Sequence, residues 1–338
     1  MGVKAGDLGE FGLIERLLSR LGATGEGVVV GPGDDAAAVR VGDATVLATA
    51  DLLLEGVHFE IGLSSPADVG WKALAVNLSD IAAMGGKPRF ALVSLGAPPA
   101  TPSGTLEQIY AGLDECARAY SVAVVGGDTV GSDRLIVSVA VVGEPGEGGI
   151  VTRSGAGRGD LACVTGTVGE AAAGLALLRA APNDPAAAEL LARYPSLATG
   201  HRRPTPRIPE GLAAARAGAT AMIDLSDGLG QDLTHICDAS GTGVRLNAGS
   251  IRPTDGVTAT SNWLGVDAVT FALGGGDDYE LLLAIPPERY DELRSAIAPI
   301  ELNAIGEFVT GRDALLDRGN RVVEPLASLG WDHFREEA

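Results

Sequence analysis

The sequence contains few residues suited to covalent, metal–sulfur or aromatic chemistry. Its 338 residues include three cysteines, four histidines and 4% aromatic side chains. The cysteines, Cys116, Cys163 and Cys237, are scattered and form no CxxC pair. Neither a disulfide framework nor a structural zinc site is therefore indicated.

Long apolar runs and basic residues are scarce as well. No run reaches the roughly 18 residues of a membrane span, and the opening MGVKAGDLGEF lacks the basic and apolar regions of a signal peptide. We therefore expect a cytoplasmic protein that does not bind membranes. The formal net charge of −19 argues against nucleic-acid binding. It does not exclude phosphate ligands, because Mg²⁺ can sit between carboxylates and phosphate oxygens.

The common phosphate-binding and catalytic motifs are also missing. There is no GxxxxGK[ST], and GPGDDAA lacks the glycine spacing of a dinucleotide site. GxSxG, HRD and DFG do not occur either. A bound nucleotide would therefore depend on metal ions and a few arginines.

The length favours two α/β domains over one, because a chain this long exceeds what one hydrophobic core commonly organises. The glycine-rich segment 143–149 predicts the boundary, which we place between residues 148 and 149. The expected domains are 1–148 and 149–338. Helices are predicted over 11–21, from Ser65 or Pro66 to Gly85, over 105–120 and over 171–180, and SVAVVGGDT is predicted to be a buried strand that opens into a glycine loop.

Acidic residues recur after apolar, strand-like runs. They are Asp34, Asp51, Asp128, Asp224 and Asp277, while Asp80 lies in an alanine-rich helical stretch one turn from Asn77. Strand ends and the loops beyond them are where α/β proteins build sites. Each aspartate alone could be a cap or turn residue, but together the six favour a multi-metal cluster.

Two further features of the sequence bear on this cluster. In the pair at 34 and 35 we expect Asp34 to be the metal ligand and Asp35 only to hydrogen-bond its loop, because neighbouring side chains of an extended segment point in opposite directions. Arg153, in a glycine-flanked loop, is the best candidate to hold phosphates, although an exposed surface arginine is an equal alternative.

Several motifs in order resemble one known family. They are GPGDDAA, TADLLLEGVHF, WKALAVNLSDIAAMGGKP, GGDT, TRSGAGRGD, DLSDGL and GGGDDYEL, which span residues 31–281. In this combination the chain resembles the thiamine-monophosphate kinases. Their superfamily includes aminoimidazole ribonucleotide synthetase, selenophosphate synthetase and a hydrogenase-maturation protein, which use ATP in a metal-rich cleft.

The resemblance implies a homodimer in which the N-terminal sheets pair into a barrel, with a C-terminal α/β domain beside each and the ATP cleft between. It implies an ATP- and Mg²⁺-dependent kinase that converts thiamine monophosphate to thiamine diphosphate. The residues that match magnesium positions are Asp34, Thr49, Asp51, Asp80, Asp128, Asp224 and Asp227. Those that match nucleotide contacts are Tyr110, Gly127, Asp128, Arg153 and Ser226, and those that match substrate contacts are His58, Asp277 and Trp331.

Some matches have structural alternatives. His58 could pack beside Phe59, Tyr110 could be part of a helix surface, and Trp331 could anchor the C-terminus. The sequence also departs from the family at two places: Thr49-Ala50-Asp51 replaces a motif with a hydroxyl at 50, and Asp277 replaces a glutamate. The second change weakens the substrate assignment at this residue.

Rival functions differ in testable features. A selenophosphate synthetase would need a reactive cysteine near the N-terminus, and the hydrogenase-maturation protein needs a C-terminal cysteine; this chain has neither. An enzyme similar to aminoimidazole ribonucleotide synthetase is the nearest enzymatic alternative, and a nucleotide-binding scaffold without turnover is the alternative from another class. For a kinase we expect direct in-line transfer without a protein nucleophile or base, with a phospho-aspartate intermediate as the alternative.

Overall fold

The structure is a computed structural model that describes residues 3–21, 25–319 and 321–326. In its first half one six-stranded sheet is combined with three helices and a short 3-10 turn. These elements are η1 (Ala5–Asp7), α1 (Gly9–Leu18), β1 (Val28–Val30), β2 (Ala37–Val41), β3 (Ala44–Leu54), α2 (Pro66–Ala83), β4 (Gly86–Ala97), α3 (Ser103–Ala119), β5 (Ala123–Gly131) and β6 (Ile136–Pro145). The strand order is β1-β2-β3-β6-β4-β5.

The second half is a seven-stranded sheet with helices on both faces. Its elements are β7 (Leu161–Thr165), α4 (Glu170–Ala180), α5 (Pro185–Arg193), α6 (Pro195–Arg202), α7 (Ile208–Ala217), β8 (Ala221–Asp224), α8 (Leu229–Ser240), β9 (Gly243–Asn247), η2 (Ala248–Ser250), α9 (Asp255–Leu264), α10 (Ala268–Gly274), β10 (Leu281–Ile285), η3 (Pro287–Arg289), α11 (Tyr290–Ala296), β11 (Leu302–Val309), β12 (Ala314–Asp317) and β13 (Val323–Pro325). The order is β13-β12-β9-β11-β7-β10-β8. The mixed α/β architecture in two halves agrees with the fold expected from the sequence, and the predicted boundary at 148/149 falls between β6 and β7.

Helix α2 is the central helix of the first half. Ser65 caps it, because its hydroxyl accepts a hydrogen bond from the Asp68 N–H while the Asp68 carboxylate accepts one from the Ser65 N–H. This capping box and Pro66 in the first turn explain why the helix begins where the sequence predicts. Most of its residues are buried against α3 and against β3, β4 and β6.

Two local predictions were wrong. The first helix ends at Leu18 and not at residue 21. Strand β5 is exposed along its whole length and forms the edge of the sheet, and the GGDT motif lies inside it, not in a loop. Gly127 is required there by close packing, because a Cβ at this position would overlap the carbonyl oxygen of Val93.

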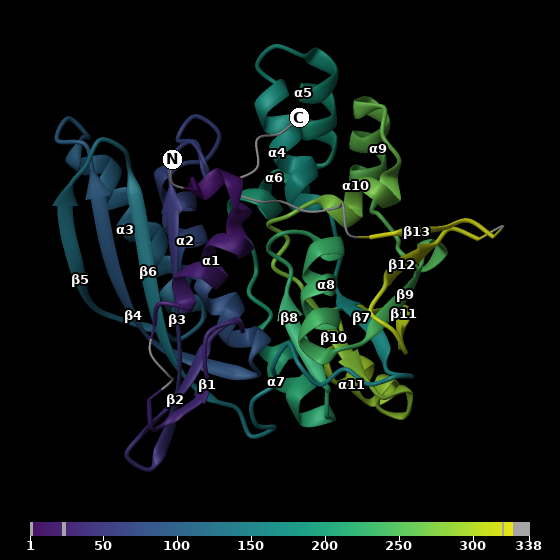
Figure 1. The fold of residues 1–338 in the computed structure, drawn as a ribbon. Coiled ribbons are helices and arrows are strands. Elements are labelled where there is room, and N and C mark those ends of the chain that lie inside the picture. Colours follow the sequence, from purple (N-terminus) through teal and green to yellow (C-terminus); the bar gives the residue numbers. More distant parts are fainter. Residues whose placement is uncertain (1–2, 22–24, 320, 327–338) are drawn as a thin grey trace.

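The two halves meet along a tightly packed junction. In Figure 1 the first sheet lies at the left, the second at the right, and α1 lies in front of the junction. Helix α7 packs on α2 and β4 as well as on its own half. Gly211 of α7 faces Ala82 of α2 so closely that a Cβ on the glycine would overlap the Ala82 carbonyl oxygen. This packing brings the C-terminal part of α2 beside β8.

No helix in the described ranges combines the length and the apolar character that a bilayer crossing needs. The three cysteines are buried free thiols.

Candidate active site at the junction

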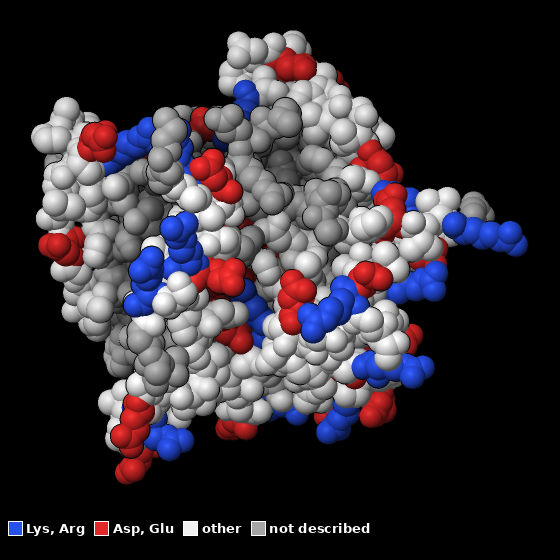
Figure 2. All heavy atoms as spheres, viewed as in Figure 1, with Lys and Arg blue, Asp and Glu red and all other residues white. Residues whose placement is uncertain are grey.

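Three aspartates from distant parts of the chain form one carboxylate group. Asp35 precedes β2, Asp80 lies on α2 and Asp224 ends β8, and one oxygen from each lies within 4.8 Å of the others. The first two belong to the first half and the third to the second half, so the group exists only because the halves pack together. Figure 2 shows acidic and basic side chains mixed at the centre of this face, where the halves meet.

Burial makes this carboxylate group unfavourable without a cation. Burial raises the pKa of Asp35 to about 7 and that of Asp224 to about 6, and it raises the pKa of Asp80 well above its usual value, with further contributions from the charges of Asp51 and Asp224. Among the residues that the structure describes, Oδ2 of Asp35 and Oδ2 of Asp224 are buried and have no hydrogen-bond partner. Clustered carboxylate oxygens with unused lone pairs are the donor set that hard divalent cations such as Mg²⁺ prefer. These residues therefore fit a magnesium site.

Strand β3 adds two residues to this group. The Thr49 hydroxyl donates a hydrogen bond of 2.6 Å to Oδ2 of Asp80, and the Asp51 N–H donates one of 3.0 Å to Oδ1 of Asn77. Burial raises the pKa of Asp51, and a hydrogen bond with the Asp80 side chain opposes this. Sequence reasoning placed Asp51 after a strand, whereas it lies inside β3, whose alternation directs it and Thr49 toward α2.

Arg153 connects the pair at 34 and 35 to the second half. Its Nε and Nη2 atoms donate to Oδ1 of Asp35 at 3.1 and 2.5 Å, and its backbone N–H donates to both oxygens of Asp34 at 3.2 Å. The structure thus places Asp35, not Asp34, inside the carboxylate group. The reason is the tight turn before it, in which Gly33 has a φ of 112° and Pro32 bridges to Asp34.

A second acidic group lies at the start of α8. Asp227, Asp232 and His235 each place a ligand atom within 4.8 Å of the others. Oδ2 of Asp232 accepts hydrogen bonds from the N–H groups of Asp227 and Gly228 at 3.2 and 3.1 Å. Burial raises the pKa of Asp227 to about 6, with a smaller contribution from the charge of Glu10 on α1. Asp227 therefore lies at the junction but in a different group from Asp80.

The residues expected to hold the substrate are linked through a buried lysine. Lys72 of α2 forms an ion pair of 2.8 Å with Asp277, and its Nζ donates to the carbonyl oxygen of His58 at 3.3 Å. Nδ1 of His201 lies 3.8 Å from the same Asp277 oxygen, and the Tyr279 hydroxyl donates to the other at 3.1 Å. Burial opposes ionisation of Asp277, but Lys72 and His201 outweigh it and lower its pKa.

The loop that carries Asp277 is held in an uncommon backbone conformation. Asp277 and Tyr279 have φ values of 70° and 53°, which are costly for residues other than glycine. The Asp277 N–H donates to the carbonyl oxygen of Ser226 at 2.8 Å, so the DLSDGL and GGGDDYEL motifs pack backbone to backbone. Such strain at the junction supports a functional role for this loop.

Asp128, Gly127 and Tyr110 lie apart from these groups. The ladder of the first sheet aligns Leu52 with Ser138, then with Ser94 and then with Asp128. Three strand spacings of about 4.8 Å put Asp128 roughly 14 Å from β3. It also shares the exposed face with Leu52, whereas Asp51 points to the opposite, α2-covered face. Tyr110 is 40% exposed on α3, and Trp331 lies outside the described residues.

Sequence reasoning missed several residues of the site. Lys72, Asp232, His201 and Tyr279 had no assigned role, although Lys72 lies in an apolar stretch of a predicted helix and Asp232 precedes His235 at helical spacing. His201 and Tyr279 carry no comparable signal, because their positions depend on how α6 and the 275–280 loop pack.

Comparisons with known proteins identify related chains. The model of the family described as AIR synthase related protein, N-terminal domain, matches residues 33–144. Thiamine-monophosphate kinase from Mycobacterium tuberculosis is 41% identical, with 97% of this chain and 92% of the relative covered. The Bacillus subtilis protein of the same name is 37% identical over 96% of this chain and 99% of its own length.

Solved structures show the same similarity. A structure of AaThiL complexed with AMPPCP and TMP superposes with a TM-score of 0.85 at 34% identity and covers 98% of this chain and 99% of that chain. A HypE–HypF complex, at 17% identity and a TM-score of 0.71, shares the fold alone.

Proposed function

The chain belongs to the thiamine-monophosphate kinase family, and from this premise we propose how its residues carry out the ATP-dependent phosphorylation of thiamine monophosphate. The observation that carries the proposal is the convergence of Asp35, Asp80 and Asp224 across the junction, where two buried carboxylate oxygens have no hydrogen-bond partner among the described residues. This arrangement suits the triphosphate of ATP when Mg²⁺ lies between the two sets of negative charge.

The proposed magnesium ligands come from both halves. They are Asp34, Thr49, Asp51, Asp80, Asp128, Asp224 and Asp227, to which the geometry adds Asp35. Bound Mg²⁺ would neutralise the developing charge on the transferring phosphoryl group and the leaving diphosphate. The role of the carboxylates would be to hold the Mg²⁺ ions in place before the substrates bind.

Transfer is direct and needs no protein base. The second pKa of a phosphate monoester is about 6, so the acceptor oxygen of thiamine monophosphate is already anionic near neutral pH. The protein therefore has to align the two phosphates in line and exclude water. The product is thiamine diphosphate.

His58 and Asp277 hold the acceptor in this proposal. Nδ1 of His58 accepts a hydrogen bond of 3.0 Å from the Leu54 N–H, so in the neutral ring the hydrogen is carried by Nε2. That tautomer presents a donor, which suits a phosphate or hydroxyl oxygen. Lys72 keeps Asp277 ionised and ready to accept a hydrogen bond from the substrate. Trp331 remains part of the proposed substrate side.

Arg153 and Ser226 form the nucleotide side of the proposal. The Arg153 guanidinium is fixed against Asp35 at the edge of the carboxylate group, where it can contact a phosphate without losing its ion pair. Ser226 lies on the loop between β8 and α8, next to Asp227. Tyr110 and Gly127 would contact the nucleotide from the exposed part of the first half.

We also propose a homodimer in which Asp128 serves the site of the partner. The outer face of the first sheet exposes Leu52, Phe90, Leu92, Val125 and Val130, each more than 40% accessible, and β5 is an unpaired edge strand. An apolar face and edge of this kind favour a second copy of the same chain. Because Asp128 lies on this face, it can reach a carboxylate group only across the dimer.

One assay tests the kinase proposal. The full chain, incubated with Mg-ATP and thiamine monophosphate, should form ADP and thiamine diphosphate in equal amounts. With a chiral γ-phosphate, inversion is expected for direct transfer, whereas retention would indicate a phospho-aspartate intermediate. Binding of ATP without ADP release upon addition of the acceptor would instead support a scaffold without turnover. A cytoplasmic location remains a prediction of the sequence.

A further inference from the structure

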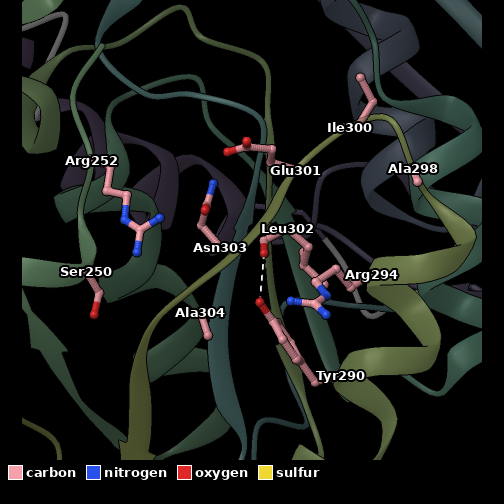
Figure 3. Close-up of a pocket in the computed structure, with 10 residues that line it drawn as sticks. All are labelled: Ser250, Arg252, Tyr290, Arg294, Ala298, Ile300, Glu301, Leu302, Asn303 and Ala304. Carbon is pink, nitrogen blue, oxygen red and sulfur yellow. Dashed lines mark hydrogen bonds between the residues drawn. The ribbon is translucent and has the colours of Figure 1, made fainter. Parts of the chain in front are cut away.

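A hollow of about 520 Å³ lies in the second half, apart from both acidic groups. Figure 3 shows it between α11, the segment after η2 and the beginning of β11. None of its lining residues belongs to the carboxylate group of Asp80 or to that of Asp232. Its volume is within the range of about 300–1,000 Å³ that is typical of small-molecule sites.

Two arginines give this hollow a positive charge. Figure 3 shows the guanidinium groups of Arg252 and Arg294 approaching the middle of the hollow from opposite sides. Within the described ranges Arg252 has no acidic side chain at ion-pair distance, and Arg294 has only the exposed Asp291 at 3.5 Å. Glu301 is the one acidic residue of the lining. The hollow is therefore net positive in a chain whose net charge is −19.

The remaining lining is held in place by the protein itself. The Tyr290 hydroxyl donates to the carbonyl oxygen of Leu302 at 2.8 Å, and Nδ2 of Asn303 donates to the carbonyl oxygen of Gly166 at 3.1 Å. The Arg294 guanidinium lies 5.8 Å from the centre of the Tyr290 ring. Ile300 adds an apolar surface. The part of the lining contributed by Tyr290 and Asn303 is therefore arranged before a ligand binds.

We propose that this hollow is a second ligand site, which binds a small organic anion: a phosphate or carboxylate group on a compact ring. Each guanidinium group can hold either anion through bidentate hydrogen bonds. The ring rests against the apolar part of the lining. The site is independent of the kinase reaction proposed above, because it shares no residue with it.

Binding is tested by calorimetry on the full chain in EDTA, where the metal-free carboxylates of the junction repel anions. The probes are phenyl phosphate, benzoate and, as a neutral match, benzyl alcohol. We expect at least one anion to bind and the alcohol not to bind. The preferred anion tells a phosphate ligand from a carboxylate ligand.

Variants locate the bound probe. Arg252→Gln and Arg294→Gln should each weaken binding roughly ten- to a hundredfold, as expected for the loss of a charged hydrogen bond. Arg289→Gln is the matched control, because Arg289 is 51% exposed beside Tyr290, pairs with Glu292 and does not line the hollow. Kinase rates should be unchanged in all three.

Three outcomes would overturn the proposal. The first is no binding of either anion at millimolar concentrations. The second is unchanged binding in the Arg252→Gln/Arg294→Gln double variant, and the third is an equal loss in Arg289→Gln. The last result would mean that general surface charge attracts the probes. Melting curves of each variant confirm that a lost signal reflects the site and not unfolding.

Discussion

The two halves of the molecule differ in how completely their sheets are covered. The second sheet has a hydrophobic core on each face, one built with α4, α8, α9 and α10 and the other with α7 and α11. The first sheet is covered by α2 and α3 on one face and leaves the other exposed, together with the edge strand β5. The second sheet is thus covered on both faces, whereas the first leaves one face accessible for the homodimer proposed above.

Substitutions in the carboxylate group test whether both halves are needed equally for catalysis. Asp80→Asn and Asp224→Asn remove one ligand from the first and one from the second half, and each should lower kcat by roughly a thousandfold because metal-held charge stabilises the transition state. The fold should persist, since losing a repelling charge does not weaken packing. Asp114→Asn, on the exposed surface of α3, is the control. A rate near that of the wild type in either junction variant would show that the substituted aspartate is not a metal ligand.

Subunit mixing tests whether the open face completes the site of a partner. Asp80→Asn and Asp128→Asn chains are each expected to be inactive as pure homodimers. If Asp128 acts across the dimer, half of the randomly mixed dimers are hybrids with one intact site of two, which restores about one quarter of the wild-type rate. If Asp128 acts within its own chain, mixing restores nothing. Activity of co-refolded mixtures at several ratios distinguishes these results.

Metal removal should make stability depend on pH in a predictable direction. The folded-state pKa values of Asp35 and Asp224 are raised to about 7 and about 6, so the folded state binds more protons than the unfolded state between about pH 4 and these values. Their contribution to the free energy of unfolding is therefore greatest near pH 4 and is lost as the pH rises to 7. We expect a loss of several kcal/mol in EDTA, because each tenfold change in proton affinity corresponds to about 1.4 kcal/mol.

Urea titrations across this pH range measure the effect. Saturating Mg²⁺ should flatten the dependence at the neutral end, because bound cations replace the protons. The Asp224→Asn variant in EDTA should show a smaller slope than the wild type. An equal slope in that variant would show that Asp224 does not contribute to the pH dependence of the free energy of unfolding.

The substrate side should show the smallest change. His58→Asn retains a donor but moves it, so we expect the KM for thiamine monophosphate to rise roughly tenfold while the KM for ATP stays the same. An effect limited to ATP would take His58 out of the acceptor site. The comparison of the two KM values also excludes general damage, which would alter both.

Features determined by neighbouring residues could be predicted from the sequence, whereas features that depend on contacts between distant segments could not. The start of α2 was predictable because Ser65, Pro66 and Asp68 determine it among themselves. Asp80 and Asp224 were identified as candidates, but their meeting depends on the contact between halves, which no local pattern encodes. Strand β5 was misread as buried because an apolar edge strand has the same composition as a strand in a core. Asp35 was expected to face away because the turn at Gly33, which rotates it inward, could not be seen.

Gly211 has no Cβ, and this lets α7 approach Ala82 of α2 closely enough for Asp80 and Asp224 to lie near each other. A methyl group at 211 would act as a wedge between α7 and α2 and would separate carboxylates that it never touches. In a genetic screen for loss of function, changes at this buried, uncharged position would be recovered beside those of the acidic residues. The positions of such mutations would mark the junction between the halves as well as the acidic residues.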